Sequence, residues 1–307
     1  MSGKGPQNIS ASVRQRLMNK AREQKEAFDL VLIRFALERL LFRLAESKHG
    51  DRFVLKGAML FQIWSGEVHR PTRDLDLLGT GTPSPEDFVV LFQDVCQQSV
   101  EDDGLEFLSD TVQAAVMKED EQYEGVRLKL ICKLASARIP IQIDIGFGDA
   151  ISPGPNQIVY PALLDFPSPT LQTYPKETVI AEKFQAMVML GIANSRMKDF
   201  FDIWSLATTF EFSGAQLAAA IGATFERRQT ALPAQPPLAL TSEFTEDKQK
   251  LAQWKGFVRK GRLTERVIEL PEIGDVLQTF LMPPTLSIAK EEEFTSMWTA
   301  GGGWRLS

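Results

Sequence analysis

Two aspartates one residue apart, Asp74 and Asp76, are the residues of this 307-residue sequence whose spacing most directly predicts chemistry. They lie in the run Asp74-Leu75-Asp76-Leu77-Leu78, which is typical of a β-strand. Alternate residues of a strand share a face, so both carboxylates would project together while the leucines pack behind them. Two neighbouring carboxylates repel unless a cation lies between them, and Mg²⁺ is held by one or two carboxylates plus substrate phosphates. The pair therefore predicts a Mg²⁺ site.

A third carboxylate is expected from a later strand. In Ile141-Gln142-Ile143-Asp144-Ile145 the strict alternation places Asp144 on the face opposite to the isoleucines. Asp149 follows closely enough to compete for the same role. Asp144 is our choice because its phase in the strand exposes it.

The elements around these acids predict an α+β fold with a mixed sheet, followed by a mainly helical C-terminal domain. We expect an N-terminal helical segment over 1–50, with an amphipathic helix at 28–44, and an α+β core over 51–160. The proline-rich stretch 152–175 indicates an extended connector and a domain boundary. Helices are expected over 175–307, ending in a flexible glycine-rich tail at 301–305.

The helical half carries a second cluster of charges. It consists of Glu182-Lys183-Phe184-Gln185-Ala186 and of Arg196-Met197-Lys198-Asp199-Phe200-Phe201-Asp202. Asp199 and Asp202 are three residues apart, so a helix places them on one face. Taken alone, such charges indicate a salt-bridged helix surface, but beside the Asp74/Asp76 pair we favour a functional role.

Composition restricts the setting of the protein. Only Cys96 and Cys132 are present, and neither a signal-peptide layout nor a long apolar segment is visible, which favours a cytoplasmic protein without membrane contact. The net charge of −6 means that nucleic acid would have to meet a local basic patch. The candidate residues for such a patch are Arg14, Arg16, Lys20, Arg22, Arg34, Arg39, Arg43, Arg227 and Arg228.

Taken together, these motifs resemble the nucleotidyltransferase fold of the DNA polymerase β superfamily, and within it the AbiEii/AbiGii toxin family of type IV toxin–antitoxin systems. That superfamily has a glycine-containing turn opening a helix, an acidic pair on the next strand and a third carboxylate on a later strand. Lys56-Gly57, Asp74/Asp76 and Asp144 match those positions, and the Glu182-Lys183 and Arg196 to Asp202 segments match the two helical motifs of the family. Ala58 departs from the usual serine or second glycine.

The resemblance implies transfer of a nucleotidyl group from an NTP to a hydroxyl, assisted by a pair of Mg²⁺ ions. Asp74 and Asp76 would hold the metals with Asp144, and Lys183 would pair with the triphosphate as a point charge. Asp199 would activate the acceptor or support a metal, oriented by Asp202 and Arg196. The further residues expected to contact the nucleotide are Lys56, Gly57, Ala58, Arg73, Arg196, Lys198 and Asp202.

The resemblance also implies an RNA acceptor, with tRNA 3′ ends as the first candidate, a block of translation, and a cognate antitoxin protein. Three alternatives remain open. A glycosyltransferase would also use Asp-x-Asp but leaves the Lys183 and Asp199 motifs unexplained. Nucleotidyl transfer to a protein or small molecule uses the same residues, and a catalytically silent binding module is favoured by Ala58.

Overall fold

The computed structural model describes residues 8–66, 69–82, 84–120, 123–263 and 269–306, and the chain divides into two compact units. The first unit comprises Met1–Gly148 and Asn156–Thr173, and the second comprises Asp149–Pro155 and Tyr174–Ser307. By this division, the N-terminal helical segment belongs to the same unit as the sheet.

A mixed seven-stranded sheet forms the centre of the first unit, as predicted. The strand order is β3-β4-β5-β2-β1-β7-β6. The pairs β2/β5 and β1/β7 are parallel, and the other neighbours are antiparallel. The strands are β1 (Phe53–Lys56), β2 (Asp74–Gly79), β3 (Leu105–Asp120), β4 (Tyr123–Leu134), β5 (Ala137–Phe147), β6 (Asn156–Val159) and β7 (Thr170–Thr173).

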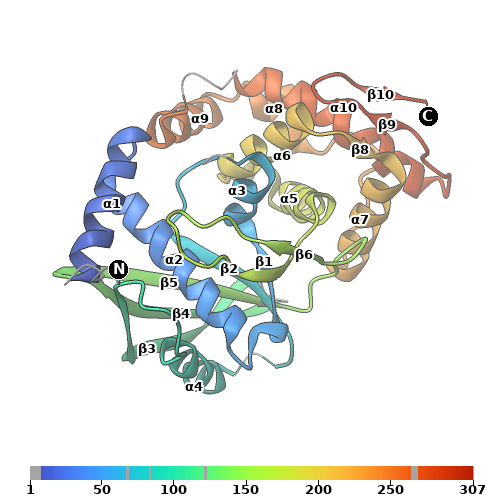
Figure 1. The fold of residues 1–307 in the computed structure, drawn as a ribbon. Helices are drawn as coiled ribbons and strands as arrows, with labels where there is room; N and C mark the ends of the chain where they lie inside the picture. The colour runs from blue at the N-terminus through green and yellow to red at the C-terminus, as the bar shows by residue number, and fades with distance from the viewer. Residues whose placement is uncertain (1–7, 67–68, 83, 121–122, 264–268, 307) are drawn as a thin grey trace. The chain divides into compact units, whose positions relative to one another are not determined.

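Helices cover the apolar face of this sheet. Leu75 and Leu77 of β2 are buried on that face, and Phe53 of β1 lies 6.1 Å from Phe88 and 5.9 Å from Phe92 of α4, measured between ring centroids. Figure 1 shows α2 running across the sheet, in agreement with its contacts to β5 and α4. The helical elements of the unit are α1 (Ile9–Glu23), α2 (Phe28–Glu46), η1 (Gly50–Arg52), η2 (Gly57–Met59), α3 (Leu60–Ser65) and α4 (Pro85–Cys96).

The helix α2 differs from the expected amphipathic helix, because every residue from Val31 to Leu44 is buried. Its charged residues are compensated inside the protein. Arg39 Nε lies 2.9 Å and Arg43 Nη1 lies 2.7 Å from Asp103 Oδ2. Burial tends to raise the pKa of Asp103, but hydrogen bonds from Arg43 and Arg39 lower it overall. Buried charges persist when they are paired in this way.

Glu38 is the other acid on this helix, and burial raises its pKa to about 7. Its Oε2 accepts a hydrogen bond from the backbone N–H of Leu163 at 2.7 Å. This contact ties α2 to the proline-rich stretch, which was expected to be a plain connector. Instead, β6 and β7 within that stretch pair with each other, and β7 pairs with β1.

The second unit is mainly helical, as predicted, and α5, α6, α7 and α10 pack against one another. The tail is ordered rather than flexible, since β10 pairs with β9 in a small sheet and Trp304 Nε1 donates to the carbonyl of Phe280 at 3.1 Å. The elements are α5 (Lys176–Leu190), η3 (Gly191–Ala193), α6 (Met197–Thr209), β8 (Phe212–Ser213), α7 (Gly214–Arg227), η4 (Leu238–Leu240), α8 (Ser242–Thr245), α9 (Lys248–Gly261), α10 (Leu270–Ala289), β9 (Met297–Trp298) and β10 (Trp304–Arg305).

None of the helices in the described ranges has the length and apolar character needed to cross a membrane.

The buried ion cluster on α2 gives a test of the fold. Asp103→Asn removes the carboxylate that faces both Arg39 and Arg43 in the protein interior, so the free energy of unfolding should fall by about 3–5 kcal/mol. Urea unfolding followed by far-UV circular dichroism measures the change. The matched control is Glu106→Gln, which removes an exposed ion pair to Lys133 and should cost less than about 1 kcal/mol. Equal effects of the two substitutions would show that the buried cluster is not a major contributor to stability.

Candidate functional site

Three carboxylates of the first unit meet on the face of the sheet opposite to the buried Leu75 and Leu77. Asp74, Asp76 and Asp144 each offer an oxygen, and these oxygens lie within 4.8 Å of one another. The geometry follows from the strand register, because parallel pairing of β2 with β5 places Asp76 beside Asp144 and Asp74 beside Gln142. We call Asp74, Asp76 and Asp144 the carboxylate triad.

Asp149, the alternative third carboxylate, has other contacts. It belongs to the second unit, where its Oδ1 lies 2.9 Å from Arg228 Nη2. Arg228 also lies 3.6 Å from Glu182 Oε1 and donates to Gln185 Oε1 at 2.9 Å. The alternation of residues along the strand therefore correctly selected Asp144 as the third carboxylate. The alternative, Asp149, was suggested only by its position close by in the sequence.

A row of four charged residues crosses the sheet at the triad. Lys56 of β1 pairs across the strands with Asp76 of β2. Asp76 pairs in turn with Asp144 of β5, and Asp144 pairs with Arg127 of β4. Directly paired residues share a sheet face. The two acids at the centre are thus flanked on both sides by a cation, which offsets part of their mutual repulsion.

Hydrogen bonds fix the orientation of the triad. Arg127 donates from Nε to Asp144 Oδ1 at 2.8 Å and from Nη2 to Oδ2 at 2.7 Å, a bidentate pair. Gln142 Nε2 donates to Asp144 Oδ2 at 3.2 Å. The hydroxyl of Thr72 donates to Asp74 Oδ1 at 2.6 Å. Such outer contacts hold metal ligands in place in metalloproteins.

Arg127, Gln142 and Thr72 were missed from the sequence. Arg127 lies in a strand of ordinary alternating composition, and only the β4/β5 register shows that it faces Asp144. Thr72 precedes the acidic pair by two residues, so a search for short polar side chains beside Asp74 would have found it.

The turn before α3 is shaped to receive Asp76. Gly57 has a φ of 76°, and a Cβ atom added there would collide with the carboxylate of Asp76. Glycine is required twice over, because an L side chain disfavours this φ and because the acid occupies the space where a Cβ would be. The helical segment after it is short, since η2 and α3 together end at Ser65.

Hard oxygen ligands converging from three side chains fit Mg²⁺ or Mn²⁺ better than a soft transition metal. The donor set suits such an ion, and Gly57 leaves the room that the Asp76 carboxylate occupies. Asp74, Asp76 and Asp144 would hold it, while Arg127 and Gln142 would orient Asp144.

In the second unit, Lys183 is held between two carboxylates. Its Nζ lies 2.5 Å from Asp199 Oδ1 and 2.9 Å from Asp202 Oδ2. The side chain of Asp202 is fully buried and that of Asp199 is 5% exposed. The helix spacing predicted that the two acids share a face, and the structure adds that they face Lys183 on α5.

The remaining predicted site residues have different environments. Arg73 is exposed and pairs with Asp29 at 2.7 Å. Arg196 and Lys198 are exposed at the start of α6. The side chain of Asp199 accepts a hydrogen bond from Lys183, and its backbone N–H donates to the carbonyl of Arg196 at 2.9 Å. Lys56 and Ala58 are half-buried beside the triad.

The glycine before α3 gives a sharp test of the triad as a cation site. Gly57→Ala should abolish the thermal stabilisation of the protein by Mg²⁺, because the added methyl group displaces Asp76. Gly66→Ala is the matched control, since Gly66 has a similar φ of 72° with no atom within 4 Å of the added Cβ. It should retain the Mg²⁺ response. If both variants lose the Mg²⁺ response, the loss is caused by backbone strain and not by displacement of Asp76.

The role of Arg127 is tested by Arg127→Met. Removing this cation leaves more uncompensated negative charge at the triad, so the metal-free protein should melt at a lower temperature while Mg²⁺ stabilises it more than the wild type. Scanning calorimetry in chelator and in Mg²⁺ measures both changes. Lys133→Met on the same strand is the control. An unchanged Mg²⁺ increment in Arg127→Met would show that Arg127 does not influence the cation site.

Comparison with known proteins identifies the family. Two solved structures from Helicobacter pylori are similar, each with 17% sequence identity and a TM-score of 0.48: a candidate nucleotidyltransferase, with 84% of this chain and 96% of that chain covered, and JHP933, with 83% and 92% covered. No curated protein matches the sequence. The model of the nucleotidyl transferase AbiEii toxin family of type IV toxin–antitoxin systems matches residues 39–279, a range that contains the triad, Lys183 and Asp199. The chain therefore belongs to the AbiEii family and is a nucleotidyltransferase.

Proposed function

We propose that this nucleotidyltransferase uses Mg²⁺ at the carboxylate triad to transfer a nucleotidyl group from an NTP to an RNA hydroxyl, with tRNA 3′ ends as the first candidate acceptor. The observation that carries the proposal is the meeting of Asp74, Asp76 and Asp144 within 4.8 Å on one sheet face. Blockage of translation would be the toxic result.

The metal would supply charge neutralisation for the phosphates and a lower pKa for the attacking hydroxyl. The protein's own residues prepare the site for it. Thr72 orients Asp74, the turn at Gly57 admits Asp76, and Arg127 with Gln142 orients Asp144. A pre-oriented ligand set reduces the reorganisation needed when substrate binds.

Lys183 is proposed to serve as the cation for the triphosphate. Two carboxylates already face its single charge, so Asp199 and Asp202 fix the position of the ammonium group. Lys56, at the end of the charged row, is a second candidate phosphate contact because it shares the sheet face of Asp76.

The RNA acceptor receives less support from surface charge than the sequence suggested. Arg34, Arg39 and Arg43 are buried in ion pairs with Glu26 and Asp103, so they are not available to a phosphate backbone. Arg228 is engaged by Asp149. The remaining candidates are Arg227, which is exposed at the end of α7, and the α1 residues Arg14, Arg16, Lys20 and Arg22. Of these, Arg16 pairs with Asp165 at 2.7 Å. The acceptor assignment therefore rests mainly on family membership.

Family membership also implies an antitoxin partner and an NTP substrate. Transfer to a protein or small molecule uses the same triad and is distinguished by the identity of the labelled product.

The direct test is incubation with total RNA, total protein, Mg²⁺ and each α-labelled NTP in turn, followed by sequencing of labelled RNA ends. The wild type should label RNA, and Asp76→Asn should not, because it removes a charged ligand without changing side-chain size. Asp110→Asn, an exposed aspartate on β3, is the control. Undiminished labelling by Asp76→Asn would remove the triad from the mechanism.

The same assay separates the roles of the two clusters. Lys183→Gln should lower NTP use while leaving the Mg²⁺-dependent thermal shift intact, since Lys183 is not a metal ligand. Label on a protein band in place of RNA would favour the alternative acceptor class.

A further inference from the structure

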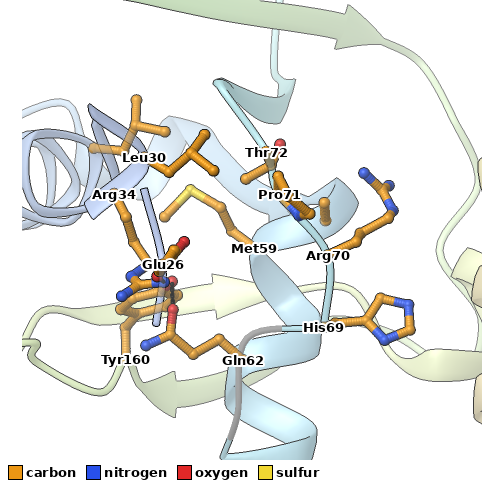
Figure 2. Close-up of a pocket in the computed structure, with 12 residues that line it drawn as sticks. Glu26, Leu30, Arg34, Met59, Gln62, His69, Arg70, Pro71, Thr72 and Tyr160 are labelled. Atoms are coloured by element: carbon orange, nitrogen blue, oxygen red, sulfur yellow. Dashed lines mark hydrogen bonds and ion pairs between the residues drawn. The ribbon is translucent and has the colours of Figure 1, made fainter. Parts of the chain in front are cut away.

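A hollow in the first unit lies between α2, the η2–α3 segment and the loop before β2. Including its open mouth, it measures about 410 Å³. Figure 2 shows Arg34, Tyr160 and Gln62 at one end and Thr72, Pro71 and Arg70 at the other, with Met59 between them. The enclosed part is smaller than this volume, so a whole nucleoside triphosphate does not fit inside it.

One wall of the hollow is apolar and one end is polar. Leu30, Leu37, Met59 and Pro71 line it with carbon and sulfur atoms. At the polar end, Tyr160 donates from its hydroxyl to Gln62 Oε1 at 3.1 Å. Burial raises the pKa of Tyr160 above its ordinary value, so the phenol stays a donor, and the Gln62 amide NH₂ is left to donate.

The contacts of Arg34 indicate that a ligand of this hollow would be neutral rather than anionic. Its guanidinium pairs with Glu26 at 2.8 Å and with Gln24 at 2.8 Å, so its charge is already balanced and a second anion gains little there. The Arg34 side chain is 10% exposed, and its Nε hydrogen has no acceptor in the part of the chain that the structure describes. A buried unpaired donor calls for a neutral acceptor atom.

Two contacts connect the hollow to the triad. Thr72 lines it and donates its hydroxyl to Asp74. Ala58 lines it and directly follows Gly57, the residue that abuts Asp76. A molecule with one end at the triad can thus place a neighbouring group in the hollow.

We propose that this hollow is a nucleobase pocket, in which a planar heterocycle packs its faces on the apolar wall and offers acceptor atoms to Arg34 and Gln62. The inference rests on the proposed transfer reaction and deepens it. The base belongs either to the incoming NTP or to the terminal nucleotide of the acceptor, since the recognising chemistry is the same. A free phosphate is disfavoured by Glu26, and a wholly apolar ligand leaves Arg34 Nε unpaired.

Binding is tested with the full chain in metal-free buffer, using adenosine, guanosine, cytidine and uridine separately as probes in ligand-detected NMR. At least one nucleoside should bind the wild type. Leu30→Trp on α2 and Pro71→Trp on the loop before β2 each fill the hollow with a larger side chain, and each should weaken that binding at least tenfold. Val90→Trp, at an exposed site on α4, is the size-matched control and should bind normally. Two independent blocking variants are used because either one alone could disturb folding, which circular dichroism monitors.

Steady-state kinetics then separates the two sources of the base. A raised KM for the NTP with an unchanged KM for the acceptor assigns the pocket to the incoming nucleotide, and the converse assigns it to the acceptor end. If no nucleoside binds, or if neither blocking variant weakens binding, the nucleobase pocket is refuted. If no pocket is found but Asp76→Asn loses transfer activity, the proposed function still holds. If a nucleoside binds in the hollow but Asp76→Asn keeps full activity, the proposed mechanism is refuted and the nucleobase pocket is not.

Discussion

Repulsion between like charges held side by side on β2 and β5 is the constraint around which the first unit is built. Asp76 and Asp144 are direct cross-strand partners, and Asp74 adds a third acid on the same face. The sheet places Lys56 and Arg127 at the two ends of this row. Three carboxylates and two flanking cationic side chains leave a net negative charge at the site. This charge attracts a divalent cation, while the two cationic side chains reduce the repulsion that the metal-free fold must tolerate.

The backbone around these charged residues also positions the carboxylate triad. The parallel β2/β5 pairing sets which residues meet, and it inserts β2 between β1 and β5 although β5 follows β2 by some sixty positions in the chain. The glycine before α3 gives the Asp76 carboxylate its space. Helix α2 is buried behind the sheet because Glu26 and Asp103 compensate its arginines. Rigid support of this kind is what a metal-ligand set requires.

Local patterns in the sequence predicted the parts that depend on local geometry. Alternation along one strand predicted that Asp74 and Asp76 share a face, and the phase of the isoleucines identified Asp144. Helix spacing likewise predicted that Asp199 and Asp202 lie together. Long-range pairing was not predictable from one sequence. Arg39 and Arg43 have the spacing of a solvated helix face, and their burial depends on distant partners: Asp103 for both and the carbonyl of Pro167 for Arg39. The role of Arg127 was not predicted either, because its partner is set by strand register. The ordered tail was not predicted because Trp304 packs on a helix that is distant in the sequence.

We expect Asp74, Asp76 and Asp144 to bind one divalent cation together. A crystal of the protein soaked with Mn²⁺, with anomalous diffraction measured at the manganese edge, tests it most directly. A manganese peak should lie at about 2.0–2.2 Å from oxygens of all three aspartates, a distance typical of small hard divalent cations. Manganese bound elsewhere, with the bidentate Arg127–Asp144 pair intact and no peak at the triad under saturating metal, would contradict it.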